Sequence, residues 1–304
     1  MSSDTTSIKF VAGSRKLFEV QRRVQTVACD LEQLISGIPP DFGDDTCALD
    51  GYRVLSLPES ARADVLRRFP RHTWGGLQHY RRHYIDMAGC FADYLTHFSG
   101  KTRSTLTRKR RKLEQLSGGT LDVEEFRGRS GIERFFAEAI PVSRLTYQTR
   151  LLDAGLPEDE TAYRTALGLA SQDRLRAFLL RVGGHAIAYL YLPVEGATLM
   201  YSHLGYDPGF AKYSPGTVLQ LEALERLFAE ERYRYFDFTE GEGAHKAMFG
   251  TDWVEACSFF LLRASWPNRL LLGSLDAFDW MVAKAKHLAA RTGILARARR
   301  ILRS

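Results

Sequence analysis

The feature that most constrains the fold is a series of strand patterns joined by very short turns. RLRAFLLRV (174–182) and HAIAYLYLPV (185–194) are separated only by Gly-Gly, a two-residue hairpin signal. A second short turn, Glu-Gly, leads into ATLMYSHLGY (197–206), which we expect to be a third strand. Three consecutive strands with such short connections must pair antiparallel, because parallel strands need a long crossover.

The crossover follows directly. TVLQLEALERLFAEE (217–231) has the apolar spacing of an amphipathic helix, and YRYFDF (233–238) and VEACSFFLLR (254–263) have strand character. Upstream, TLDVEEF (120–126) predicts a strand, and SGIERFFAEAIPVSRLTY predicts a helix with a break at Pro141. This order predicts an α+β fold: a mixed, mostly antiparallel sheet flanked by helices and interrupted by one crossover helix.

Length and composition narrow the class of protein. The 304 residues suit two domains, and an apolar content of 45% with 18 phenylalanines excludes a mainly disordered chain. The four cysteines are far apart, which argues against a disulfide framework or zinc site, so no metal is expected. The start MSSDTTSIKF lacks the pattern of a signal peptide, and no apolar run approaches the roughly 20 residues of a membrane span. We therefore expect a soluble, cytoplasmic protein.

The net charge of +6 is concentrated at one end of the chain. Residues 281–304 hold seven of the 42 Lys and Arg residues and no acidic residue, so 35 basic residues face 36 acidic ones elsewhere. Seven further basic residues lie in KTRSTLTRKRRK (101–112), where Leu106 and Leu113 recur as they do in a partly buried helix. The body of the protein is thus close to neutral.

The loop DPGFAKYSPG, which precedes the crossover helix, is a candidate anion site. Backbone N–H groups in the first turn of a helix have no partner within the helix and attract anions such as a pyrophosphate. Ser214 is placed to cap this helix, with Pro215 first and Gly216 allowing close approach. Thr217 adds a hydroxyl and Lys212 a cation. On this local pattern alone, an ordinary capped helix is the simpler interpretation.

Two titratable residues on the neighbouring strands are candidate bases. Asp237 is expected within a half-buried strand, where a carboxylate is costly unless it is paired or functional. It suits a general base or a cation-binding group, and a structural role, as a salt bridge to an arginine or a cap of the EGEGAHK loop, is an equally good explanation. His203 titrates near neutrality, although a lone strand histidine is more often only hydrogen-bonded in place. His245 and Lys246 follow in a glycine-rich loop, where solvated charges are the usual explanation.

These residues also carry a family resemblance. HLGYDPGFAKYSPGTVLQLEALERL and YRYFDFTEGEGAHKAMFG resemble the C-terminal half of GNAT-type acetyltransferases related to FemAB ligases, a group associated with cellulose and exopolysaccharide biosynthesis. The resemblance extends over about 80–262. The positions that match the family pattern are Tyr213-Ser214-Pro215-Gly216, Leu219, Phe236-Asp237-Phe238, Gly241, Lys246 and Phe249.

The resemblance implies two GNAT-like halves, of which the N-terminal one is shorter. The implied division is a reduced N-terminal GNAT-like domain (1–100), a basic helical connector (101–119), an acyl-CoA-binding GNAT domain (120–265) and a basic amphipathic helix (266–304). It further implies acetyl-CoA or another acyl-CoA as co-substrate and an amine or hydroxyl of a small molecule or saccharide precursor as acceptor.

The candidate site residues combine this resemblance with side-chain chemistry, from which His203 and Lys212 are taken. Asp237 and His203 are the candidate catalytic residues. The candidate acyl-CoA contacts are Leu204, Gly205, Lys212, Tyr213, Ser214, Gly216 and Thr217. The candidate acceptor contacts are Tyr147, Gln148, Tyr235 and Lys246.

Two alternatives stay open from the sequence. A FemAB-like transferase would take its acyl group from aminoacyl-tRNA, with 101–112 as an RNA contact, whereas the first interpretation involves no nucleic acid. A non-catalytic GNAT-fold module would dock on a partner or a membrane. The sequence 281–304 supports a peripheral membrane contact, because its apolar residues share one helix side opposite a basic one, and a helix packed on the body explains the pattern equally well. The oligomeric state is left open.

Overall fold

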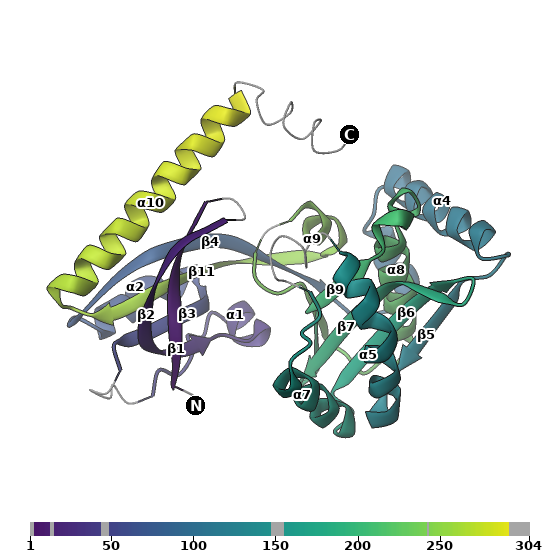
Figure 1. Ribbon diagram of the computed structural model, residues 1–304, viewed down its shortest axis with the longest axis horizontal. Helices are drawn as coiled ribbons and strands as arrows, with labels where there is room; N and C mark the ends of the chain where they lie inside the picture. Colours follow the sequence, from purple (N-terminus) through teal and green to yellow (C-terminus); the bar gives the residue numbers. More distant parts are fainter. Residues whose placement is uncertain (1–2, 13–14, 44–48, 147–154, 242, 292–304) are drawn as a thin grey trace. The chain divides into compact units, whose positions relative to one another are not determined.

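The structure, a computed structural model, describes residues 3–12, 15–43, 49–146, 155–241 and 243–291 (Figure 1). Its internal packing divides the chain into two compact units. Unit 1 comprises Met1–Arg81 and Val254–Ser304, and unit 2 comprises Arg82–Trp253. The chain passes from one unit to the other within two strands, β4 (His72–Asp86) and β11 (Asp252–Arg263).

Unit 1 is a twisted sheet covered by helices. Its strands lie in the order β1-β2-β3-β11-β4, in which β1 pairs antiparallel with β2, β2 parallel with β3, and β3 antiparallel with β11. Besides β4 and β11, its elements are β1 (Ser3–Ala12), β2 (Arg15–Ala28), α1 (Leu31–Ser36), β3 (Gly51–Pro58), the 3₁₀ helix η1 (Glu59–Ala61), α2 (Arg62–Arg68) and α10 (Trp266–Arg291).

The strand β11 shows how this sheet is covered on both faces. Successive side chains of a strand point to opposite faces. Accordingly, Phe259 and Leu261 pack in the cluster that includes Val65 of α2. Leu262 instead packs against Leu272 of α10. The apolar run SFFLL is therefore buried because helices lie against both faces.

Unit 2 contains the hairpins predicted from the sequence. Its strands follow the order β4-β10-β8-β7-β6-β5, and β9 pairs with β7 outside this path. Its remaining elements are α3 (Phe91–Thr96), α4 (Gly100–Leu116), β5 (Asp122–Phe126), α5 (Gly128–Leu145), α7 (Glu160–Ser171), β6 (Leu175–Val182), β7 (His185–Glu195), β8 (Thr198–Met200), β9 (His203–Tyr206), the 3₁₀ helix η2 (Pro208–Tyr213), α8 (Pro215–Ala229), β10 (Tyr235–Asp237) and α9 (Ala244–Phe249).

Helices also cover both faces of this second sheet. Leu180 and Leu190 of the central strands pack with α8 and with Leu106 and Leu113 of α4, as expected for a partly buried connector. The alternate residues of the same strands, such as Leu179, pack against α5 and α7 (Figure 1). The sheet is therefore the middle layer of unit 2.

The fold class expected from the sequence is confirmed. The sheet is mixed and mostly antiparallel, and α8 is the crossover between β8 and β10, which pair in parallel. Two local expectations were wrong. The helix α5 continues through Pro141 instead of breaking there, and the single strand expected over 197–206 is two strands, β8 and β9. The division into four domains and the GNAT-like character of the N-terminal half stay predictions.

A glycine at the start of β3 provides a test of this packing. Gly51 has a φ of 149°, and a Cβ placed there would lie 2.1 Å from the carbonyl oxygen of Leu261. We expect Gly51→Ala to lower the free energy of unfolding by more than about 2 kcal/mol, because backbone must move to relieve the clash. Gly168→Ala in α7, where a Cβ meets nothing within 4 Å, should instead raise it by about 0.5–1 kcal/mol. Chemical denaturation measures both, and equal stabilities would contradict the packing described.

Candidate functional site

The sheet of unit 2 parts at the end of β8. The strand β8 pairs with β10 on one side and with β7 on the other. The last bond toward β10 is donated by Tyr201 N to the carbonyl oxygen of Asp237, over 2.8 Å. Beyond it the chain continues as β9, which within the described residues pairs only with β7. One edge of β9 therefore carries backbone N–H and C=O groups that no described strand engages.

A cavity of about 560 Å³ lies where the strands part. That volume is within the usual range for small-molecule sites. Its walls come from β9, from the first turn of α8, from the segment after β10 and from α9. The lining residues are Tyr201, Ser202, His203, Leu204, Tyr206, Gly216, Thr217, Thr239, Gly243, His245 and Lys246. The cavity thus unites β9 and the helix start that the sequence singled out separately.

The first turn of α8 has the geometry of an anion site. Pro215 is its first residue, as predicted, and the first N–H groups of a helix have no partner within it. Gly216 is buried, and a Cβ there would lie 2.8 Å from Leu204 Cδ2. The expectation that the Ser214 side chain caps this helix was wrong. Ser214 adopts the left-handed conformation (φ 54°, ψ 51°), which turns the chain from η2 into α8, and its side chain makes no capping bond.

A second, basic cavity of about 450 Å³ lies beside η2. Lys112, Gln115 and Leu116 of α4 line one side, and Lys212 and Tyr213 line the other. Lys112 and Lys212 are both exposed, and their ammonium groups give this cavity a positive charge. The predicted cofactor residues are therefore divided between two places: Leu204, Gly216 and Thr217 in the larger cavity, and Lys212 with Tyr213 in the basic one.

Asp237 is placed in the interior and not on the cavity wall. Its side chain is fully buried and forms an ion pair with Arg82, whose Nε lies 3.1 Å from Oδ1 and whose Nη2 donates to Oδ2. Oδ1 also accepts the N–H of Thr239 at 2.8 Å. Of the two explanations offered by the sequence, the observed contacts match the salt bridge to an arginine.

His203 and Tyr201 do face the cavity. The ring of His203 is half-buried, and its centroid lies 5.8 Å from that of Tyr191. Burial lowers the pKa of His203 below its usual value of 6.5, so the imidazole is neutral at pH 7 and can accept a proton. Burial also raises the pKa of Tyr201, which keeps its hydroxyl protonated and able to donate.

His245 and Lys246 also line the cavity, although solvated charges were the expected explanation for their loop. Both are half-buried on α9. His245 Nε2 lies 2.6 Å from the amide oxygen of Gln220 in α8, and burial with the nearby charges of Lys109 and Lys246 lowers its pKa to about 4. Lys246 donates to the carbonyl oxygen of Glu240, and burial lowers its pKa. The short spacing of His245 from Asp237 along the chain was the one signal for this placement.

The remaining predicted residues lie elsewhere. Gly205 is buried on β9, where a Cβ would lie 2.4 Å from the ring of Tyr189, so its lack of a side chain serves packing. Tyr235 of β10 stacks edge-on against Tyr84, with centroids 5.6 Å apart. Tyr147 and Gln148 lie outside the described residues.

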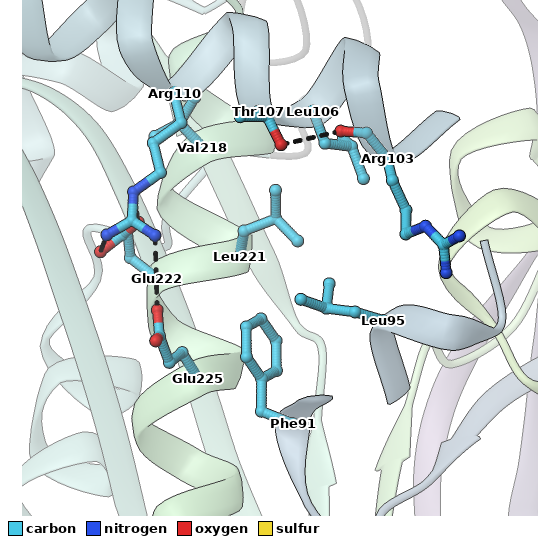
Figure 2. Close-up of a pocket in the computed structure, with 10 residues that line it drawn as sticks. All are labelled: Phe91, Leu95, Arg103, Leu106, Thr107, Arg110, Val218, Leu221, Glu222 and Glu225. Atoms are coloured by element: carbon cyan, nitrogen blue, oxygen red, sulfur yellow. Dashed lines mark hydrogen bonds and ion pairs between the residues drawn. The ribbon is translucent and has the colours of Figure 1, made fainter. Parts of the chain in front are cut away.

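A third cavity, of about 160 Å³, lies on the side of α8 that faces α3 and α4 (Figure 2). Its floor is apolar, with Leu95 and Leu221 pointing into it, and Arg110 spans one side. Arg110 Nε lies 3.0 Å from Glu222 Oε1, and its Nη1 lies 3.7 Å from Glu225. None of the predicted site residues is among the described residues that line it. Its ion pairs fasten α4 to α8.

No group of three or more His, Cys, Asp or Glu side chains within the described ranges could hold a metal ion. Residues 100–247 match the family model of the acetyltransferase (GNAT) domain. The matched segment is slightly less than half of the 304-residue chain, and it identifies the chain as a transferase.

Solved structures resemble the chain at low sequence identity. FemX matches with a TM-score of 0.56 and 12% identity, covering 89% of this chain and 90% of FemX. L-PGS from Bacillus licheniformis matches with a TM-score of 0.46 and 13% identity, covering 74% and 72% of the two chains. No curated protein matches. Because the identity is so low, the likeness to FemX shows the fold alone.

The buried ion pair of Asp237 predicts a large effect on stability. We expect Asp237→Asn to lower the free energy of unfolding by about 3–5 kcal/mol, because it leaves the buried guanidinium of Arg82 without its counter-charge. Glu160→Gln, which removes an exposed i,i+4 pair with Arg164, should leave stability nearly unchanged. Urea denaturation of both variants checks this. A fully stable Asp237→Asn variant would show that the pair is not structural.

The depressed pKa of His245 predicts a pH dependence of stability. A histidine whose folded pKa is about 4 and whose unfolded pKa is 6.5 stabilises the fold above pH 6.5 and loses this contribution as the pH falls toward 4. Between pH 7 and pH 5 the loss should be about 2 kcal/mol. His245→Gln should show a smaller change between pH 7 and pH 5 than the parent chain. Parallel slopes for the two proteins in urea titrations would contradict the assignment.

Proposed function

We propose that the chain is an acyl-CoA-dependent acyltransferase that moves an acetyl or other acyl group directly to an amine or hydroxyl of a small molecule or saccharide precursor. The observation that carries the proposal is the meeting of an unpaired strand edge, β9, with the N-terminus of α8 in one cavity. The GNAT domain match over residues 100–247 supports acyl transfer as the class of reaction.

The residues present suit the parts of an acyl-CoA. The first turn of α8 offers N–H groups to the pyrophosphate, and Gly216 adds no side chain there. Lys112 and Lys212 supply cations for the phosphate groups in the neighbouring basic cavity. The unpaired edge of β9 offers backbone groups to the amides of the pantetheine arm, as a neighbouring strand would. The thioester then supplies the activated acyl group.

The chain's own residues serve the transfer at the other end of the cavity. The acceptor nitrogen or oxygen attacks the thioester carbonyl carbon, so that its new bond to carbon forms and the carbon–sulfur bond breaks. His203 takes the proton that the acceptor loses. The departing thiolate takes up the proton held by His203, while the hydroxyl of Tyr201 donates a hydrogen bond to it and backbone N–H groups of β9 stabilise the oxyanion. We assign the base to His203 because the carboxylate of Asp237 is enclosed by Arg82.

Several polar groups that line the cavity suit a polar acceptor. Thr239 and Ser202 present hydroxyls, and Lys246 presents an ammonium group whose pKa is lowered by burial. Such groups can hydrogen-bond a saccharide, in keeping with the resemblance to enzymes associated with exopolysaccharide biosynthesis.

One observation favours a second candidate, transfer from aminoacyl-tRNA. Exposed basic side chains of α4, among them Arg108, Arg111 and Lys112, extend to the basic cavity. Such a row can follow an RNA backbone. Filter binding of tRNA with a steep salt dependence, lost on charge reversal at Arg108 and Arg111, would favour this donor over acyl-CoA.

Thermal unfolding with acetyl-CoA tests the donor site. Ligand at about 100 times its dissociation constant should stabilise the chain by roughly 2.7 kcal/mol, which raises the melting temperature by a few degrees. Gly216→Val should abolish the shift, because its side chain would enter the cavity beside Leu204. Gly100→Val at the start of α4, where a Cβ meets nothing within 4 Å, should keep it. No shift with acetyl-CoA or longer acyl-CoAs would contradict the proposal.

The role of His203 predicts both a rate and a pH profile. With an acceptor in hand, we expect His203→Gln to lower kcat by about 10²–10³-fold, since general base catalysis contributes on that order, without weakening acetyl-CoA binding. The rate of the parent chain should decrease as the pH is lowered, with an apparent pKa below 6.5, because protonated His203 cannot accept a proton. His185→Gln, an exposed histidine at the start of β7, should change neither. An unaltered rate in His203→Gln would exclude it as the base.

A further inference from the structure

The helix α10 of unit 1 carries large apolar side chains on its outer surface. Trp266 is 77% exposed, Leu270 59%, Trp280 62% and Met281 54%. These are large exposed fractions for residues that normally contribute to cores or interfaces. The inner side of the same helix is already used: Leu272 and Leu275 pack against β1 and β2.

The exposed residues form one continuous stripe. Trp266, Leu270, Gly273, Ala277, Trp280 and Lys284 follow one another at alternating intervals of four and three residues, which places them on one side of an α-helix. All six are exposed. Asp276, one of the acidic residues of α10, lies off this stripe and accepts the N–H of Gly76 at 2.6 Å. The outer stripe is therefore apolar and ends in a lysine.

The C-terminal part of α10 projects away from the rest of unit 1 (Figure 1). Leu275 is its last buried residue among those whose burial is described, and from Asp279 to Ala285 only Val282 is half-buried. In this projecting part, Trp280 and Met281 form an exposed apolar surface. The ammonium group of Lys284 lies 4.6 Å from the Trp280 ring centroid. Neighbouring tryptophan and lysine side chains are the combination found at membrane–water interfaces.

Charge determines which occupant suits this stripe. Residues 281–304 hold seven Lys and Arg residues and no acidic residue. A second copy of the chain would carry the same positive charge in this part of its sequence, whereas the surface of an anionic bilayer would be complementary to it. Among the described helices, none is long and apolar enough to cross a bilayer, so contact would be lateral.

We propose that the outer stripe of α10 binds the surface of an anionic phospholipid membrane, with Trp266, Leu270, Trp280 and the neighbouring Met281 entering the interface and Lys284 meeting the lipid headgroups. The contact thus begins well before the 281–304 segment that the sequence indicated. It concerns unit 1 and is independent of the donor and base assigned to unit 2. It would hold the enzyme close to acceptors that lie at a membrane surface.

Vesicle sedimentation of the full chain tests the proposal. We expect the chain to pellet with vesicles of phosphatidylglycerol and phosphatidylcholine, and much less with phosphatidylcholine alone or in about 0.5 M salt, where the screening length is only about 4 Å. Trp266→Ala/Trp280→Ala should lower the bound fraction by about tenfold or more at equal lipid. The matched control is Trp74→Ala/Trp253→Ala, which removes two tryptophans of 42% and 40% exposure elsewhere. It should bind like the parent chain.

A second measurement reports directly on the surroundings of Trp280. The chain has four tryptophans, so Trp74→Phe/Trp253→Phe/Trp266→Phe leaves Trp280 as the sole indole. Its emission should move to shorter wavelength when phosphatidylglycerol vesicles are added. No pelleting of the parent chain, equal binding by the two double variants, or an unmoved Trp280 emission would overturn the proposal. A dimer detected by light scattering that the Trp266/Trp280 variant dissociates, without vesicle binding, would assign the stripe to self-association instead.

Discussion

The buried carboxylate of Asp237 is the contact on which the site depends. Its two side-chain oxygens bind Arg82 of β4 and the N–H of Thr239, while its backbone oxygen accepts Tyr201 N at the end of β8. One residue thus joins β4, β8 and the segment that forms the far wall of the cavity. Because removing one partner of a buried ion pair is strongly destabilising, these three segments are held in fixed relation at the point where β8 ends its pairing with β10 and the chain continues as β9. The cavity lies where the sheet is tied on one side of this point and no described strand pairs with the free edge of β9 on the other.

Two residues in unfavourable backbone conformations frame the same opening. Ser214 and Thr239, neither of them glycine, have φ values of 54° and 60°. Each redirects the chain beside the cavity: Ser214 turns η2 into α8, and Thr239 turns the chain after β10 toward α9. Residues in this region cost energy that the surrounding contacts must offset, and such positions gather at functional sites. Here the bond from Thr239 N to Asp237 supplies part of the compensation.

Local patterns predicted most of the elements, and non-local contacts account for the errors. The helix α8 and the strands β6 and β7 follow from periodicity, Pro215 and the two-residue turn, all of which act over a few residues. Arg82, the partner of Asp237, lies 155 residues away along the chain. A salt bridge could therefore be predicted from the sequence, but its arginine could not be identified. The division of 197–206 into β8 and β9 depends on β10, which lies beyond the crossover helix. For the candidate site, His203, Leu204, Gly216, Thr217 and Lys246 line one cavity, while the contact of His245 with Gln220 of α8 joins residues 25 positions apart and follows from no motif.

Because the chain crosses between the two units twice, unit 2 is synthesised in full before unit 1 is complete. Unit 2 is a continuous segment, Arg82–Trp253, inserted between the two parts of unit 1. During synthesis β3 is complete long before β11, its antiparallel neighbour, leaves the ribosome. The segment of unit 2 can therefore fold first, while the edge of β3 stays open and prone to pair with other chains. The completion of unit 1 becomes the last step. A chain truncated after residue 253 retains every described residue that lines the cavity between β9 and α8, while it lacks most of β11, the neighbour of β3.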